Sequence, residues 1–251
     1  MPYDISPRTL VRALALLILC LTGCVQDSPP SSKEHTVSLL LELLHDEAPE
    51  IRRTAVESLG KIGDARASEA ILHLKNDPAP IVREASVLAI GRLKPTVTDG
   101  VVSLLTQALE DPVESIRQSA VVAIGEIESD SRLLPPIVEL LRSSAPTVRR
   151  AAARALLQVD ASQSIASLAA AGRDSDAEVR QGVVAAMGEW GGSAVTSWLR
   201  ERLAQDLSPG VRAEAAYRLG TFGDSETKAA LETAGTKDAD SGVRRWAKRG
   251  I

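Results

Sequence analysis

The chain has 251 residues and a formal net charge of −4, and 44% of its residues are hydrophobic. These values fit a folded protein of one or two domains, and they argue against a nucleic-acid partner, which needs a basic surface. Aromatic residues make up only 2% of the chain. Because a compact core usually buries more rings, this composition favours thin layers of helices packed through Ala, Val, Leu and Ile.

Residues 1–23 have the organisation of an export signal. Arg8 and Arg12 precede an apolar run over 13–21, and that run is shorter than the roughly 20 residues that span a bilayer. The run leads into Leu-Thr-Gly before Cys24, which resembles the lipobox of bacterial lipoproteins. The resemblance implies cleavage before Cys24 and lipid attachment to it. The alternative is an ordinary signal peptide that ends in a Cys by chance.

Residues 24–33 are predicted to be the lipidated Cys and a flexible tether, because Pro29, Pro30 and the neighbouring serines favour neither a helix nor a packed core. The residue after Cys24 is Val25 rather than Asp. In the lipoproteins that the chain resembles, this favours the periplasmic side of the outer membrane, provided that the host has two membranes. Cys20 lies in the signal, so the mature chain has no disulfide or thiolate nucleophile.

An internal repeat fills residues 34–251. An apolar-Arg pair recurs seven times, and its Arg residues are Arg52, Arg83, Arg117, Arg149, Arg180, Arg212 and Arg244. Six residues before each Arg stand Asp46, Asp77, Asp111, Ser143, Asp174, Asp206 and Asp238. We place the repeats at about 34–63, 64–94, 95–128, 129–160, 161–191, 192–223 and 224–251. Repeats of this length are typical of solenoids.

Each repeat is predicted to contain two helices, A and B. Three residues before the Arg, four repeats have a Pro, which suits the first turn of helix B. Along helix B the apolar residues follow the 3.6-residue period of a one-sided helix. Gly eight residues after the Arg would allow close packing, and a second glycine column (Gly63, Gly191, Gly223) suits a left-handed helix stop. No segment alternates with period two, so no strand is expected.

The segment Val-Arg-Ala-Glu-Ala-Ala-Tyr-Arg-Leu-Gly-Thr-Phe-Gly-Asp over 211–224 resembles the HEAT family, in the short form of bilin-lyase-type repeats. Residues 51–64 match in the same way. The resemblance implies an all-α, right-handed α-solenoid of about seven HEAT-like helix pairs. It says little about function, because one fold serves many roles.

In HEAT proteins the recurring Asp and Arg form a hydrogen-bonded ladder between neighbouring repeats. The resemblance assigns this role to Asp46/Arg52, Asp77/Arg83, Asp111/Arg117, Asp174/Arg180, Asp206/Arg212 and Asp238/Arg244. Ser143 is expected to weaken the rung at Arg149. The alternative is a row of ligand-binding charges, but residues present in every repeat favour a structural role in stacking.

No catalytic constellation is found, and no metal or cofactor site is expected. The three histidines are His35, His45 and His73, and none belongs to a ligand pair. Helical repeats of the deoxyhypusine-hydroxylase type bind two irons with His-Glu pairs, and this chain has no His-Glu dipeptide. No phosphate loop or Gly-x-Ser-x-Gly elbow is present.

A candidate partner-binding surface remains on the side of helix B opposite its core stripe. Apolar residues should not stand on an exposed face without reason, yet this face includes Leu88, Val122 and Tyr217. The arginines predicted beside them are Arg53, Arg92, Arg150 and Arg154. The alternative is that these side chains pack between neighbouring B helices. Trp198 occupies a mostly small or polar position in helix A and is either a binding anchor or the filling of a local gap.

The sequence therefore predicts a membrane-anchored scaffold that binds another protein through the concave, B-helix face of the solenoid. One alternative is an enzyme or enzyme subunit of the bilin-lyase type, although an export signal argues against ligation of a chromophore in the cytoplasm. Another alternative is a passive spacer in a cell-envelope complex.

Overall fold

The computed structural model describes residues 30–127 and 130–251, and every regular element in these ranges is a helix. Seven A/B helix pairs follow one another, which confirms the predicted all-α repeat fold. The chain divides into two compact units, residues 1–127 and 128–251. The described part of the first holds three repeats and that of the second holds four.

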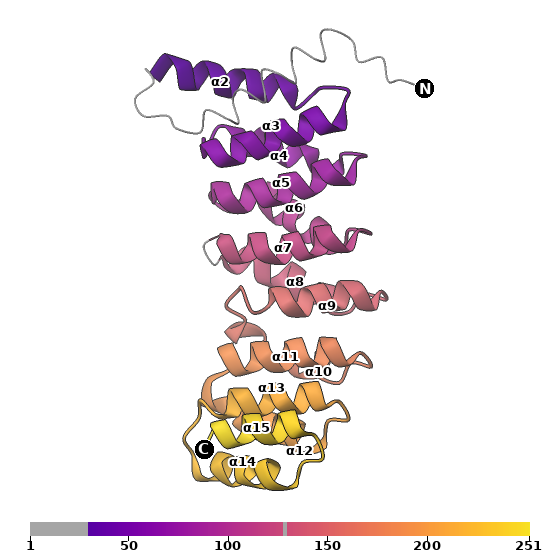
Figure 1. Ribbon diagram of the computed structural model, residues 1–251, viewed down its shortest axis with the longest axis vertical. Coiled ribbons are helices and arrows are strands. Elements are labelled where there is room, and N and C mark those ends of the chain that lie inside the picture. Colours follow the sequence, from indigo (N-terminus) through magenta and orange to yellow (C-terminus); the bar gives the residue numbers. More distant parts are fainter. Residues whose placement is uncertain (1–29, 128–129) are drawn as a thin grey trace. The chain divides into compact units, whose positions relative to one another are not determined.

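In the first unit, each A helix precedes a longer or equal B helix. The A elements are α2 (Pro30–Leu43), α4 (Ala67–Leu72) continued by the 3-10 turn η1 (His73–Asn76), and α6 (Asp99–Leu109). The B helices are α3 (Pro49–Ile62), α5 (Pro80–Leu93) and α7 (Glu114–Glu126). Figure 1 shows α3, α5 and α7 stacked side by side, with α4 and α6 behind them. The B helices therefore form one continuous face of this unit.

The second unit repeats this plan. Its A helices are α8 (Leu134–Leu140), α10 (Ile165–Ala171), α12 (Thr196–Gln205) and α14 (Ser225–Lys237), the first three preceded by the 3-10 turns η2 (Ser131–Leu133), η3 (Ser162–Ser164) and η4 (Gly192–Val195). Its B helices are α9 (Pro146–Ala155), α11 (Ala177–Trp190), α13 (Pro209–Leu219) and α15 (Ser241–Arg249). Neighbouring B helices again pack on one another, as α11 does on α9 and α13.

The Pro column marks the start of helix B, as predicted. Helices α3, α5, α9 and α13 each begin at its Pro, where the missing N–H has no intrahelical partner. The prediction that glycine ends helix B in the left-handed conformation is confirmed only at Gly63, which caps α3 at φ 70°. Gly191 follows α11 at φ −85° instead. At the corresponding place after α5, Lys94 adopts the left-handed conformation with φ 45°.

The core consists of small and branched side chains that fill the space between thin helix layers. Ala55, Val56 and Leu59 on α3 are fully buried, as the 3.6-residue period predicts. The glycine after them also acts as predicted, because a Cβ added at Gly60 would lie 3.0 Å from the Cβ of Ala89 on α5. Close approach of the B helices thus depends on the absence of a side chain at this position.

The N-terminal prediction is wrong in one respect. Residues 30–33, assigned to the tether, are the first turn of α2. Pro30 begins that helix, where Pro is tolerated, so it does not break it. The predicted signal peptide and Cys24 lie outside the described residues. Within the described ranges, no helix has both the length and the apolar character needed to cross a bilayer.

Candidate binding surface

The recurring Arg and Asp form a ladder in each unit, with a forward register. Arg52 donates from Nε and Nη2 to the two carboxylate oxygens of Asp77 in the next repeat, at 2.7 and 2.8 Å. Its Nη1 donates to the backbone carbonyl of Asp46 at 2.7 Å. The same fork-to-carboxylate contact joins Arg83 to Asp111, Arg149 to Asp174, Arg180 to Asp206 and Arg212 to Asp238. Each guanidinium therefore ties its own turn to the following one.

The rungs hold ionised carboxylates. Burial alone would raise the pKa of Asp77, but the hydrogen bonds from Arg52 and from the amide of Ala79 outweigh burial, so the pKa is lowered. The same balance lowers the pKa of Asp111, Asp174 and Asp206. These carboxylates are engaged in contacts within the chain.

The weakened rung expected at Arg149 is not observed. Arg149 is fully engaged, with Asp174 at 2.7 and 2.9 Å. Arg117 belongs to the last repeat of the first unit, so no further repeat of that unit supplies it with a carboxylate. Arg117 instead contacts the carbonyl of Asp111 and the carboxylate of Glu114, and its buried Nε has no hydrogen-bond partner in the described ranges.

A groove of about 320 Å³ lies between α3 and α5 in the first unit. Its lining includes three of the predicted surface residues: Arg53 from α3, and Leu88 and Arg92 from α5. The other lining residues are Glu57, Lys61, Ile81, Glu84 and Ala85. The helices bring these residues together because they pack in parallel and present the same helical positions side by side.

The groove combines an apolar floor with cations at one end. Ile81 is 37% exposed and Leu88 is half-buried, so apolar surface is open to a ligand. Lys61 and Arg92 are exposed, stand in the last turns of their helices, and form no ion pair within the part of the chain described. Arg53 is close to Glu57, at 3.6 Å. The prediction omitted Lys61, although its position nine residues after the ladder Arg belongs to the exposed columns, and Ile81, which lies outside them.

Three other residues predicted to bind a partner lie outside the groove. Val122 is 52% exposed on α7, but it does not line the groove. Arg150 donates to Asp176 at 3.0 and 2.5 Å, and Arg154 donates to Glu178 at 2.8 Å. These two arginines thus join α9 to the start of α11 rather than standing open to a partner.

The two predicted aromatic residues differ in their surroundings. Tyr217 on α13 is 48% exposed and meets the ring of Trp246 edge to face, with centroids 5.2 Å apart. Trp198 on α12 is half-buried, and its ring occupies the space beside Gly172, where an added Cβ would collide with it. This favours the gap-filling interpretation of Trp198.

No cluster of three or more His, Cys, Asp or Glu side chains that could hold a metal occurs in residues 30–127 or 130–251. Five of the carboxylates with lowered pKa are held by ladder arginines, and others cap helices, as Asp224 caps α14. The described surface includes a shallow groove and exposed cations.

A family model for HEAT repeats matches residues 5–91, 102–187 and 165–251. Because these matches cover most of the sequence, the chain belongs to the HEAT-repeat family. No curated protein matches the sequence significantly.

The chain is also similar to solved structures of other proteins. The chain is 18% identical to YibA of Escherichia coli, with a TM-score of 0.56, over 99% of this chain and 98% of that one. The CpcE–CpcF complex of phycocyanin lyase from Nostoc sp. PCC7120 gives 19% identity and a TM-score of 0.49, with 91% and 89% covered. Human deoxyhypusine hydroxylase gives 20% identity and a TM-score of 0.41, with 97% and 96% covered. The likeness to YibA, at 18% identity, shows the fold alone.

Proposed function

We propose that this chain is a membrane-anchored scaffold that binds a partner protein through its B-helix face. The observation that carries the proposal is the groove between α3 and α5, where Arg53, Leu88 and Arg92 come together. HEAT repeats are well suited to this role, because stacked helices offer an extended surface to a partner.

The groove fits a peptide segment of defined chemistry. An apolar side chain of the partner would cover Ile81 and Leu88, and a carboxylate beside it would meet Lys61 and Arg92. Such a contact combines burial of apolar area with charge pairing at the edge of the site.

A pull-down with the full chain tests this function. The variant that combines Leu88→Ser with Arg92→Glu should lose a stoichiometric partner that the wild type retains. The matched control combines Leu207→Ser with Lys228→Glu, because Leu207 is 93% exposed in a turn and Lys228 is exposed on α14. The control should retain the partner. Equal capture by both variants would contradict the assignment to the groove.

The same preparation separates the two alternative functions. A bound tetrapyrrole, visible in the absorbance spectrum of the purified chain, would favour a role of the bilin-lyase type. Absence of both chromophore and stoichiometric partner would favour a passive spacer in the cell envelope. The basis of our preference is the open groove together with the export signal in the sequence.

The membrane anchor belongs to the proposal as well. Cys24 follows Leu-Thr-Gly behind an apolar segment, and Val25 after it favours the outer membrane in a host with two membranes. Cys24→Ala should abolish the lipid mass on the N-terminal peptide and release the chain from the membrane fraction. A chain that remains in the membrane fraction without lipid would contradict lipidation as the means of anchoring.

A further inference from the structure

Two aromatic rings in contact, each with a guanidinium group over it, form a row across α13 and α15 in the second unit. Arg218 lies over the ring of Tyr217, with 5.2 Å between its Cζ and the centroid. Tyr217 meets Trp246 edge to face at 5.2 Å and 69°. Arg249 lies over Trp246 at 5.0 Å. These four residues, which we name the ring–arginine row, come from two different repeats.

Helix α15 is strongly cationic. Between Ser241 and Arg249 it has four cations, Arg244, Arg245, Lys248 and Arg249, and no acid, whereas the whole chain has a net charge of −4. Cations four residues apart on a helix, as Arg245 and Arg249 are, repel each other. The helix dipole offsets this for residues in the last turn but not for Arg245. Folding alone thus gives little reason for a helix of this composition.

The cations of α15 differ in their hydrogen-bond and ion-pair partners. Arg244 donates to the carbonyls of Asp238 and Ala239 at 2.7 and 2.8 Å, in the manner of a ladder Arg. Arg245, Lys248 and Arg249 are exposed and have no ion pair within the described residues. In the ring–arginine row, Arg218 is already neutralised, by Glu214 at 2.9 Å and Glu189 at 2.5 Å. The open charge therefore lies at Arg245, Lys248 and Arg249, of which Arg245 and Arg249 stand one helical turn apart on the same side of α15.

The Trp246 ring holds the guanidinium of Arg249 in a position where it can bind a partner. A guanidinium stacked on an aromatic face keeps its N–H edge available, and that edge matches a carboxylate with two parallel hydrogen bonds. Tyr217 remains 48% exposed beside it, and Tyr, Trp and Arg are the residues that dominate binding energy at protein interfaces. Because Trp246 is half-buried against Tyr217, it is poorly placed to insert into a bilayer.

We propose that Arg245, Arg249 and the exposed ring of Tyr217 form a second docking site, which takes an acidic segment of a partner protein. The carboxylates of that segment pair with the two arginines, and its apolar atoms cover the tyrosine ring. The site shares no residue with the groove between α3 and α5, so either site can fail without the other.

Binding of short fluorescent peptides to the full chain, followed by anisotropy, tests the second site. Oligoglutamate should bind and weaken as salt is added, because exposed charges are screened. Oligoglutamine and oligolysine should not bind. The pair Arg245→Glu and Arg249→Glu should weaken binding about tenfold or more, and Arg245→Gln with Arg249→Gln should give an intermediate loss.

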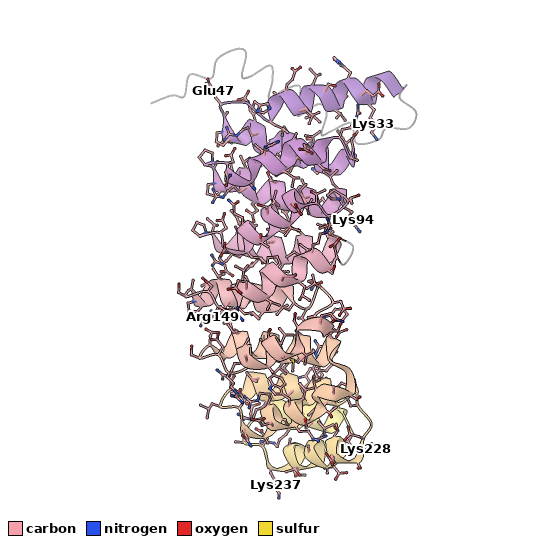
Figure 2. All side chains as sticks on the ribbon, turned by 180° about the vertical axis from the view of Figure 1, so that it is seen from behind. Lys33, Glu47, Lys94, Arg149, Lys228 and Lys237 are labelled. Atoms are coloured by element: carbon pink, nitrogen blue, oxygen red, sulfur yellow. The ribbon has the colours of Figure 1, made fainter. Side chains whose placement is uncertain are left out.

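The matched control is Lys228→Glu with Lys237→Glu, which makes the same charge change on α14 of the same repeat. Figure 2 shows these two lysines near opposite ends of that helix. The control should bind oligoglutamate within about twofold of the wild type. The difference between the two pairs should persist when Leu88→Ser and Arg92→Glu remove the groove.

Three outcomes would overturn the proposal. One is equal binding by the α15 and α14 pairs, and another is binding of oligoglutamine as strong as that of oligoglutamate. The last is failure of oligoglutamate to bind while phosphatidylglycerol vesicles, but not phosphatidylcholine vesicles, bind in an Arg245- and Arg249-dependent way. That result would reassign the site to anionic lipid. Circular dichroism confirms that each variant is folded.

Discussion

At the scale of single residues, the recurring Asp and Arg side chains hold neighbouring repeats together by buried, charged hydrogen bonds. The side chain of Asp77 is only 4% exposed, and it accepts three hydrogen bonds, two from Arg52 and one from the amide of Ala79. A buried pair of this kind gives modest net stability, but removal of one partner leaves the other charge buried and unpaired. The ladder residues are therefore positions where a substitution strongly affects stability.

Asp77→Ala should lower the free energy of unfolding by about 3 kcal/mol, because the guanidinium of Arg52, 11% exposed, loses its carboxylate. Urea unfolding followed by circular dichroism measures this loss. The control is Glu139→Ala, which breaks an ion pair with Arg142 whose side chains are 67% and 71% exposed. Its cost should be below about 1 kcal/mol. Similar costs for both variants would show that burial of the rung contributes nothing.

The ladder also shows what the sequence could not predict about single residues, namely which Asp each Arg contacts. The sequence identified the members of both columns, but it predicted a weak rung at Arg149, which is fully paired with Asp174. Spacing along the chain cannot reveal the register, since the Arg lies six residues from one Asp and faces another across the helix stack. The register depends on which turn the guanidinium meets after the repeats have packed.

At the scale of helices, starts are more predictable than stops. Pro at the first position fixes where helix B begins, because its ring and its missing N–H are tolerated only there. Stops depend on the backbone after the helix. Among three glycines in corresponding places, only Gly63 takes the left-handed conformation, while Lys94 takes it without being a glycine.

Gly63→Ala should destabilise the chain by about 1 kcal/mol, because a Cβ is strained at φ 70°. No atom lies within 4 Å of the added Cβ, so steric collision does not contribute. Gly223→Ala is the matched control, since its surroundings are equally open and its φ is not positive. Thermal unfolding should show a lower midpoint for the first variant only. Equal midpoints would mean that the left-handed stop has no energetic role.

At the scale of the whole molecule, the five Arg–Asp rungs of the two units make the free energy of unfolding depend on pH. The pKa of each rung carboxylate is lowered in the folded chain, so stability is fully present above the unfolded pKa, near 4. It is lost as the pH falls through the lower folded values.

Urea unfolding midpoints should therefore be nearly constant between about pH 7 and pH 5 and should fall steeply between about pH 4 and pH 2. Asp77→Asn should have a lower midpoint at neutral pH and a shallower fall in acid, since it has one fewer carboxylate to protonate. Parallel curves for the variant and the wild type would contradict a contribution of this rung to acid sensitivity.

The sequence by itself determined the repeat, the helix pairs, the start of each B helix and the identity of the ladder residues. These features follow from local rules, namely the helical period, the chemistry of Pro and the recurrence of one motif. Tertiary structure alone decided which helix faces meet. It gathered Lys61, Leu88 and Arg92 into one groove, paired Arg150 and Arg154 with acids of the next repeat, and brought Tyr217 against Trp246. Such contacts join residues about one repeat apart, and their geometry depends on how closely small side chains and glycines let the helices approach.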